Sequence, residues 1–327
     1  MNHDTLDTTT EDRAETTEPL RRSSEPTAPA STGDALSHTT AAGEWALWKE
    51  MFLELVHYRE LLYQMVLRDI RIRYKQAAMG FGWALFMPLM VVAAGCLVKF
   101  ALAYASGDPV DTPRLAGMSV KALGWAFFAG ALGFSSNSLT SNITLVTKVY
   151  FPREAFPFSA VVTQVFDTAV GSAFLTVFLV LFAGLRWSPT LLWAPLLIVL
   201  LILFTAAAAL FLSCANVFFR DVKYLVQVIL TFGIFFTPVF YEPHFFGPRG
   251  AKWMMLNPLS PLLEGLRLAV IEHHDLLQPL LVQAKNGAEI VAWQPWYLAY
   301  AAAWAVLGFF LSWRMFHKLE FVFAEYI

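Results

Sequence analysis

Residues 191–215 read LLWAPLLIVLLILFTAAAALFLSCA and contain no charged side chain. A helix crosses the apolar core of a bilayer with about 20 such residues. Five further stretches have a similar apolar character, at residues 82–104, 123–145, 158–182, 224–240 and 296–313. The pattern predicts an all-α integral membrane protein with six transmembrane helices.

The composition of the whole chain agrees with this class. Of its 327 residues, 57% are hydrophobic and 15% are charged, and the mean hydropathy is +0.54. Soluble domains are about 45–50% apolar and about 25% charged. The formal net charge of −2 gives no indication of a nucleic-acid partner. The two cysteines, Cys96 and Cys214, both lie in apolar stretches, where we expect free thiols.

The N-terminal part differs from the rest. Residues 1–43 are rich in Thr, Ser, Glu, Ala and Pro, so they cannot bury enough apolar surface to fold, and we expect a disordered cytoplasmic tail. The membrane domain would then comprise residues 44–327. Residues 45–76 show apolar side chains at helical spacing and end in Arg68, Arg71, Arg73 and Lys75. This combination is typical of an amphipathic helix on a membrane surface.

Basic residues near the ends of the expected spans fix the orientation. Most of them flank one side, namely Arg68, Arg71, Arg73, Lys75, Lys148, Arg153, Arg220, Lys223, Arg314 and Lys318. The short loops of the other side hold Arg114 and Arg186, and its longer segment balances basic with acidic residues. Because Lys and Arg accumulate on the cytoplasmic side, both termini are expected in the cytoplasm.

Motifs of enzymatic chemistry are absent from the sequence. It has no Walker pattern, no H-E-x-x-H and no G-x-S-x-G. We therefore expect no catalytic residue, no metal and no cofactor of its own, and any ATP that drives the protein must bind to another chain. Adjacent His273 and His274 would point about 100° apart on a helix and suit one metal ion poorly.

The segment at residues 147–157 joins two expected spans. We expect Pro152 and Pro157 to prevent a continuous helix here. Lys148, Arg153, Phe151 and Phe156 make the segment both basic and aromatic. It could insert into a partner or form an ordinary loop, and the sequence leaves both interpretations open.

Asp167 is an acid within an expected span. Counted from Phe158 at 1.5 Å per residue, it lies roughly 14 Å deep, near the middle of an apolar core about 30 Å thick. An acid there costs about 2.5–3.5 kcal/mol and must face the bundle, a partner or water. A structural hydrogen-bonding role and a role in a transport path both remain open.

Aromatic residues form a further pattern, at Phe232, Phe235, Phe236 and Phe240. Their steps of three and four residues predict one shared helix face, which Tyr241 would extend. Facing lipid is the ordinary explanation for such residues. Alternatively, this face and Asp167 could line a transport path. The following residues, 241–280, mix Pro and polar residues with apolar stretches, which predicts short re-entrant helices.

Several blocks, taken in order, resemble one known family. They are Arg73, Tyr74, Lys75 and Gln76, then Lys148, Phe151, Pro152 and Glu154, then Thr237–Tyr241, then Asn257, Pro258, Glu264 and Arg267, and finally Glu320 and Phe323. Together they resemble the permease subunits of type-2 ABC exporters that move lipid-linked polysaccharides such as O-antigen, capsule or teichoic acid. The acidic tail departs from the usual pattern of that family.

The resemblance implies a homodimer of permeases with two ATPase subunits in the bacterial cytoplasmic (inner) membrane, with ATP bound by the partner. It implies ATPase coupling through Arg71, Arg73, Tyr74, Lys148, Tyr150, Phe151, Pro152, Arg153 and Glu154. It also places Asn257, Pro258, Glu264 and Arg267 in the re-entrant segment between the fifth and sixth spans. A small-molecule or drug efflux permease would share the fold and is the main alternative. A membrane-embedded transferase would need acids or histidines at the membrane face, and we find no such set.

Overall fold

The computed structural model describes residues 41–75, 82–106, 112–148, 151–182, 187–283 and 289–323. The chain divides into two compact units, residues 1–50 and residues 51–327. The predicted disordered tail lies outside the described residues, except that its last three residues belong to α1 (Ala41–His57).

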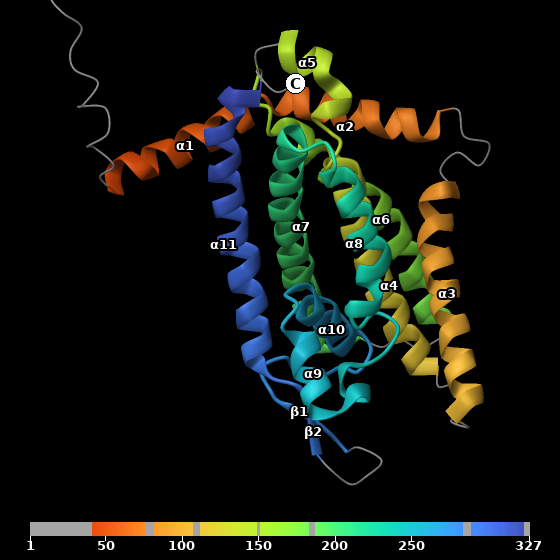
Figure 1. Cartoon of the computed structure of the whole chain (residues 1–327). Coiled ribbons are helices and arrows are strands. Elements are labelled where there is room, and N and C mark those ends of the chain that lie inside the picture. The colour runs from red at the N-terminus through yellow and green to blue at the C-terminus, as the bar shows by residue number, and fades with distance from the viewer. Residues whose placement is uncertain are drawn as a thin grey trace, which may run out of the picture. The chain divides into compact units, whose positions relative to one another are not determined.

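The described part is almost entirely helical (Figure 1). After α1 come α2 (Arg59–Tyr74), α3 (Gly82–Ser106), α4 (Thr112–Ser135), η2 (Thr140–Asn142), α5 (Ile143–Lys148), α6 (Ala155–Phe182), η3 (Pro189–Leu192), α7 (Trp193–Phe218) and α8 (Val222–Phe236). The chain continues through η4 (Pro243–Phe246), α9 (Gly247–Met255), α10 (Leu259–Val270), β1 (Leu280–Gln283), β2 (Glu289–Trp293), α11 (Pro295–Leu319) and η5 (Glu320–Val322).

Four helices among the described residues are long and apolar enough to cross a membrane. They are Pro113–Ser135, Ala155–Leu181, Pro189–Phe218 and Pro295–Val322. α3 has 25 residues and thus the length of a span. α8 has only 15 residues, about 22 Å of helix, which is less than the roughly 30 Å apolar core. The chain is therefore a multi-pass membrane protein.

The second span begins and ends earlier than predicted. We expected residues 123–145, but the helix is Thr112–Ser135. The predicted bounds were therefore wrong, and the observed helix includes Lys121. The structure buries Lys121 against Glu264, so the helix continues through it. After Ser135 the chain turns through polar Ser136 and Asn137.

The expected interface helix at residues 45–76 is two helices, α1 and α2. They are separated by Tyr58, whose φ of −88° and ψ of 16° depart from the α-helical region. Neither Pro nor Gly marks this position, so the sequence carried no sign of the break. The last residue of the expected helix, Gln76, lies outside the described residues.

Pro157 does not interrupt the chain as we expected. It is the third residue of α6. The amide groups of a first helical turn have no partner within the helix, so a proline there removes no hydrogen bond. α6 therefore begins directly after Glu154.

The helices of the second unit pack as a bundle with two distinct ends (Figure 1). α7 packs against α11, α4 against α6, and α10 against both α4 and α7. α2, α5, the start of α6 and the last turns of α11 lie at one end, which we name the α2 end. α9, α10 and the antiparallel hairpin of β1 and β2 lie at the opposite end, the α10 end. The hairpin was not predicted from the sequence.

Two glycines of α4 allow α10 to approach closely. A Cβ atom at Gly124 would lie 2.5 Å from a side-chain carbon of Leu263, and one at Gly117 would lie 2.8 Å from Cγ of Arg267. The two glycines are seven residues apart and so share one face of α4. This face positions Glu264 and Arg267 of α10 against the bundle core.

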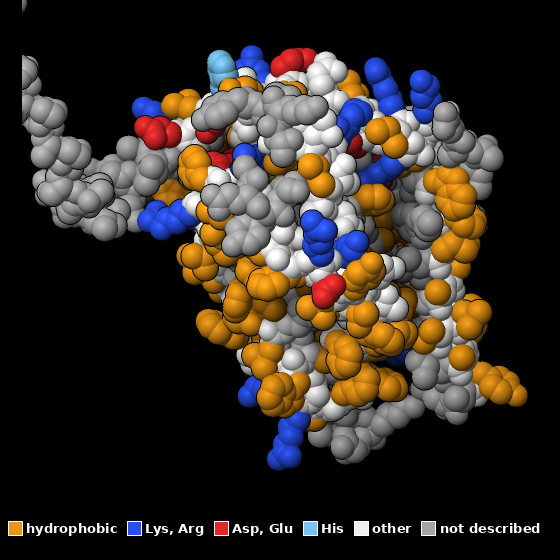
Figure 2. All heavy atoms as spheres, turned by 45° about the horizontal axis from the view of Figure 1, so that its top comes forward, with side chains coloured by type: hydrophobic (Ala, Val, Ile, Leu, Met, Phe, Trp, Pro, Cys, Tyr) orange, Lys and Arg blue, Asp and Glu red, His pale blue; other side chains and the backbone are white. Residues whose placement is uncertain are grey.

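Charged and apolar side chains are distributed unevenly over the surface. In Figure 2, most Lys, Arg, Asp and Glu side chains gather toward the α2 end, and hydrophobic side chains cover the flanks. An apolar flank of this kind is what the lipid-facing surface of a membrane protein requires.

Candidate functional site

Asp167 of α6 meets the end of α2. The Tyr74 hydroxyl donates a hydrogen bond of 2.7 Å to Oδ1 of Asp167. The Arg73 guanidinium pairs with the other carboxylate oxygen and donates to Oε1 of Gln164 at 3.3 Å. The same guanidinium lies 3.7 Å from the centre of the Phe134 ring of α4. Two groups of residues that the sequence analysis treated separately are therefore one cluster.

The chemistry of this cluster is that of a satisfied ion pair. The side chains of Asp167 and Arg73 are 10% and 18% exposed, so each charge needs the other. Burial and then the neighbouring Asp167 carboxylate raise the pKa of Tyr74. Its hydroxyl stays protonated and serves as the hydrogen-bond donor. Since three helices contribute, the cluster joins α2, α4 and α6.

The remaining face of α2 is accessible. Arg71 and Lys75 are exposed, as is Ile72. Arg68 is paired with the neighbouring Asp69 at 2.8 Å. Of the three basic residues at the end of α2, Arg73 is thus used inside the protein, whereas Arg71 and Lys75 lie on the surface of the α2 end.

Much of the predicted coupling segment, residues 147–157, packs against other parts of the same chain and is not exposed to a partner. Pro152 and Glu154 are buried, and the half-buried Phe151 ring lies 5.2 Å from that of Phe156. The Arg153 guanidinium donates to the backbone carbonyl of Glu320. The side chain of Lys148 and the whole of Tyr150 lie outside the described residues.

Glu154 lies next to the last turns of α11. Its carboxylate is 3.3 Å from Nδ1 of His317. Burial raises the pKa of Glu154, and the neighbouring imidazole opposes that shift. Glu154 therefore contacts α11 and does not project from the surface.

A second buried charge cluster lies at the α10 end. Nζ of Lys121 donates to Glu264 at 3.2 Å and to the carbonyl of Tyr241 at 2.7 Å. The Arg267 guanidinium donates to the other oxygen of Glu264 at 2.6 and 2.9 Å and also pairs with Glu272. Lys121 and Glu264 are each only 1% exposed. We refer to Lys121, Glu264, Arg267 and Glu272 as the ion network.

Glu264 is the centre of the ion network. Burial alone would raise the pKa of its carboxyl group, but Arg267 and Lys121 outweigh burial and lower it to about 2. The carboxylate is thus charged and binds α10 to α4. From the sequence, Glu264 and Arg267 were identified only through a resemblance, and Lys121 was not identified. The available signal was a lysine inside an otherwise apolar stretch.

Asn257 and Pro258 connect α8 to α10. Nδ2 of Asn257 donates to the Thr237 hydroxyl at 3.0 Å, and its Oδ1 accepts from the amide of Leu259 at 3.2 Å. Pro258 directly precedes α10. These contacts fix the start of α10 against the chain that follows α8.

The aromatic pattern is divided between two environments. Phe232, Phe235 and Phe236 are 58%, 58% and 75% exposed, whereas Phe240 is 7% exposed. The prediction of one face shared by all four was therefore wrong. α8 ends at Phe236 because Pro238 lacks an amide hydrogen and forces Thr237 into an extended conformation, with φ of −103° and ψ of 134°.

Phe240 turns back into the core instead of continuing the helix. Tyr241 is half-buried, and its hydroxyl donates to the carbonyl of Phe235. We refer to Phe232, Phe235 and Phe236 as the α8 aromatic face.

The long apolar helices and the apolar flanks are those of a multi-pass membrane protein. Residues 60–271 match the ABC-2 type transporter family, and the chain belongs to that family.

The relatives of this chain include proteins named O-antigen export system permease protein RfbA, among them one from Myxococcus xanthus and one from Klebsiella pneumoniae. The protein from Myxococcus xanthus is 29% identical over 226 residues, which are 67% of this chain and 84% of that protein. The protein from Klebsiella pneumoniae is 25% identical over 219 residues, which are 65% of this chain and 81% of that protein.

Proposed function

We propose that this protein is the permease subunit of an ATP-driven exporter that moves a lipid-linked polysaccharide across the bacterial inner membrane. The observation that carries the proposal is the similarity to two O-antigen export permeases over more than four fifths of their length. The cargo class comprises O-antigen, capsule, teichoic acid and related glycans. The permease forms a homodimer with two separate ATPase subunits that bind the ATP, and it has no catalytic residue of its own.

The α2 end is the docking side for the ATPase in this proposal, and it faces the cytoplasm. Arg71 and Lys75 are exposed there and can pair with acidic groups of a partner. Arg73 and Tyr74 transmit movement of α2 to α6 through Asp167, since a paired charge resists separation.

In this proposal, the α8 aromatic face lines the path along which the polysaccharide crosses the membrane. Its three rings are exposed in a single chain, and they lie on the short helix that ends where the chain turns into η4 and α9. Exposed rings can form many weak and similar contacts with sugar faces, which suits a polymer that must slide. Six spans and a re-entrant α9–α10 segment complete the proposed arrangement.

The test is deletion of the gene in its own host, followed by analysis of surface polysaccharide. We expect one surface glycan to disappear and its lipid-linked form to accumulate inside the cell. The wild-type gene should restore export. Normal surface glycan together with lost resistance to a small toxic compound would instead support the efflux alternative.

A further inference from the structure

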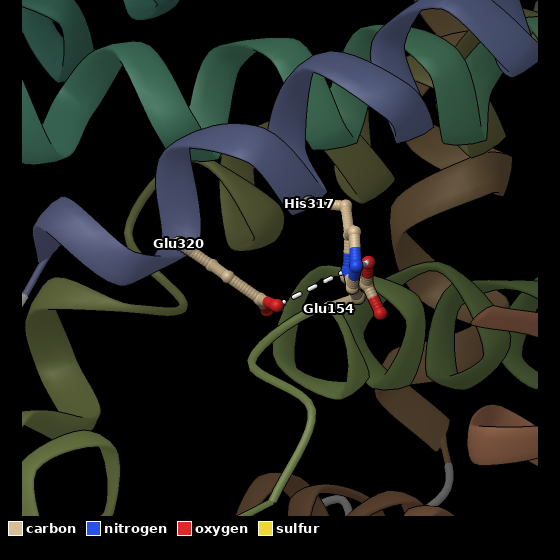
Figure 3. Close-up of side chains that lie close together, drawn as sticks. All are labelled: Glu154, His317 and Glu320. Atoms are coloured by element: carbon tan, nitrogen blue, oxygen red, sulfur yellow. Dashed lines mark ion pairs between the residues drawn. The ribbon is translucent and has the colours of Figure 1, made fainter. Parts of the chain in front are cut away.

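Glu154, His317 and Glu320 converge at the α2 end (Figure 3). Nδ1 of His317 lies 3.3 Å from Oε1 of Glu154 and 3.1 Å from Oε1 of Glu320. Glu154 precedes α6, His317 belongs to the last turns of α11, and Glu320 begins η5. One imidazole nitrogen thus faces two carboxylates from parts of the chain far apart in sequence.

The burial of Glu154 requires compensation. Its side chain is 2% exposed, compared with 14% for Glu320 and 26% for His317. A buried carboxylate is costly unless a positive charge or hydrogen bonds compensate it. Within the part of the chain that the structure describes, Oε1 of Glu154 and Nδ1 of His317 have no hydrogen-bond partner.

The two separations are long for charged hydrogen bonds. A protonated nitrogen and a carboxylate oxygen that share a hydrogen bond lie about 2.7–2.9 Å apart. Zinc lies about 2.0–2.2 Å from nitrogen and oxygen ligands, so two of its ligands are roughly 3.4 Å apart in a tetrahedral site and roughly 3.0 Å apart in an octahedral one. The observed 3.1 and 3.3 Å lie within this range. One ligand atom from each of the three residues lies within 4.8 Å of the others.

We propose that Glu154, His317 and Glu320 bind one divalent first-row transition-metal ion, with water completing its coordination. One imidazole nitrogen and two carboxylate oxygens suit Zn²⁺ or Mn²⁺. The two carboxylates together neutralise the charge of the ion, and the ion offsets the cost of burying the negative charge of Glu154. The site would fasten the chain before α6 to the end of α11, where Arg153 also contacts the Glu320 carbonyl.

The site goes beyond the proposed transport function and does not depend on it. No metal was expected from the sequence, because it contains no H-E-x-x-H pattern and because Glu154 is far from His317 and Glu320 along the chain. Their proximity arises only because α6 starts beside the end of α11.

The experiment uses the full-length protein in detergent, purified with an affinity tag that lacks histidine. After treatment with a chelator and dialysis, the protein is titrated with Zn²⁺ by calorimetry and with Mn²⁺ by electron paramagnetic resonance. We expect one strong site per chain and loss of the free Mn²⁺ signal on binding. His317→Ala and Glu320→Gln should each weaken that site at least ten-fold.

His274→Ala is the matched control, because it removes a histidine from the α10 end, and its binding should equal that of the wild type. Size-exclusion profiles and melting temperatures show whether each variant is folded. Glu320→Gln keeps the size of its side chain, so it tests the site even where His317→Ala fails to fold. Absence of a Zn²⁺ or Mn²⁺ site in the wild type would overturn the proposal. Unchanged binding by folded Glu320→Gln would do the same, leaving the cluster as ion pairs only.

Discussion

The Tyr74 hydroxyl donates a 2.7 Å hydrogen bond to the Asp167 carboxylate and so joins the end of α2 to α6. Arg73 completes the contact with an ion pair to the same carboxylate. A basic helix at the bundle surface is thereby fixed to an acid inside a long apolar helix. The Arg73 guanidinium also donates to Gln164 and lies over the Phe134 ring, so the cluster contains side chains from three helices.

The first prediction concerns Asp167→Asn. The variant leaves the mostly buried Arg73 charge without its partner, and removal of one partner from such a pair costs up to about 3–5 kcal/mol. We expect a lower melting temperature in detergent and less export per ATP hydrolysed. Tyr74→Phe should cost only about 0.5–1.5 kcal/mol, since it removes one hydrogen bond.

The matched control is Tyr63→Phe, because Tyr63 lies on the same helix but is 56% exposed. Its melting temperature and coupling should equal those of the wild type. If Asp167→Asn keeps both properties as well, the cluster neither stabilises the protein nor couples α2 to α6.

The second prediction concerns the ion network. Lys121→Met removes one of the two cations that compensate buried Glu264, and we expect destabilisation of about 3–5 kcal/mol. Lys252→Met on α9 is the control, because this lysine is exposed and its replacement should change stability by less than about 0.5 kcal/mol. Thermal unfolding of the two proteins under identical conditions decides the matter. Equal melting temperatures would show that Lys121 is not needed for packing α10.

The third prediction is an acid-dependent loss of stability through Glu264. Its folded-state pKa of about 2 is below the value of about 4.3 expected in the unfolded chain. The carboxylate therefore stabilises the fold above pH 4.3, and this contribution, on the order of 3 kcal/mol, is lost as the pH falls toward 2. Melting temperatures of the wild type should decline in this range. The Glu264→Gln variant should have a lower melting temperature than the wild type at pH 7, and its melting temperature should fall less with decreasing pH. If the melting temperatures of the two proteins fall in parallel, Glu264 does not cause the loss of stability.

The fourth prediction is the orientation of the bundle. In a protein with Cys96→Ser and Cys214→Ser, we expect a single cysteine at Lys252→Cys to react with an impermeant thiol reagent in intact cells. A cysteine at Ser141→Cys should react only after permeabilisation. Both positions are exposed. Lys252 belongs to α9 at the α10 end, and Ser141 belongs to η2, which directly precedes α5 at the α2 end. The reverse labelling pattern would place the α2 end outside the cell.

The apolar stretches predicted much of the fold. The expected third span, residues 158–182, differs from α6 only by three residues at its start. Apolar stretches of this length form helices because a bilayer leaves the backbone no other hydrogen-bonding partners. The second span was misplaced because the partner of Lys121 is a residue 143 positions later, and local hydropathy does not contain that information.

The candidate site was predicted as separate parts. Arg73, Tyr74 and Asp167 were each named, but their contact depends on how α2 packs on α6. Likewise, residue spacing placed Phe240 with the exposed phenylalanines, although Pro238 ends the helix before it. Helical spacing predicts which residues share a face only within one continuous helix, and Phe240 lies beyond the end of α8.

The fifth prediction separates the α8 aromatic face from the core. Phe236→Ala and Phe232→Ala remove exposed rings, so each should change stability by less than about 0.5 kcal/mol. If the rings contact the cargo at about 0.5–1.5 kcal/mol each, export should fall roughly two-fold to ten-fold. Phe240→Ala should instead destabilise the protein by about 3–5 kcal/mol, because its ring is in the core. The measurement is surface polysaccharide at matched amounts of folded protein. Full export by Phe232→Ala and Phe236→Ala together would assign the face to lipid, since a lipid-facing ring can be replaced without cost to transport.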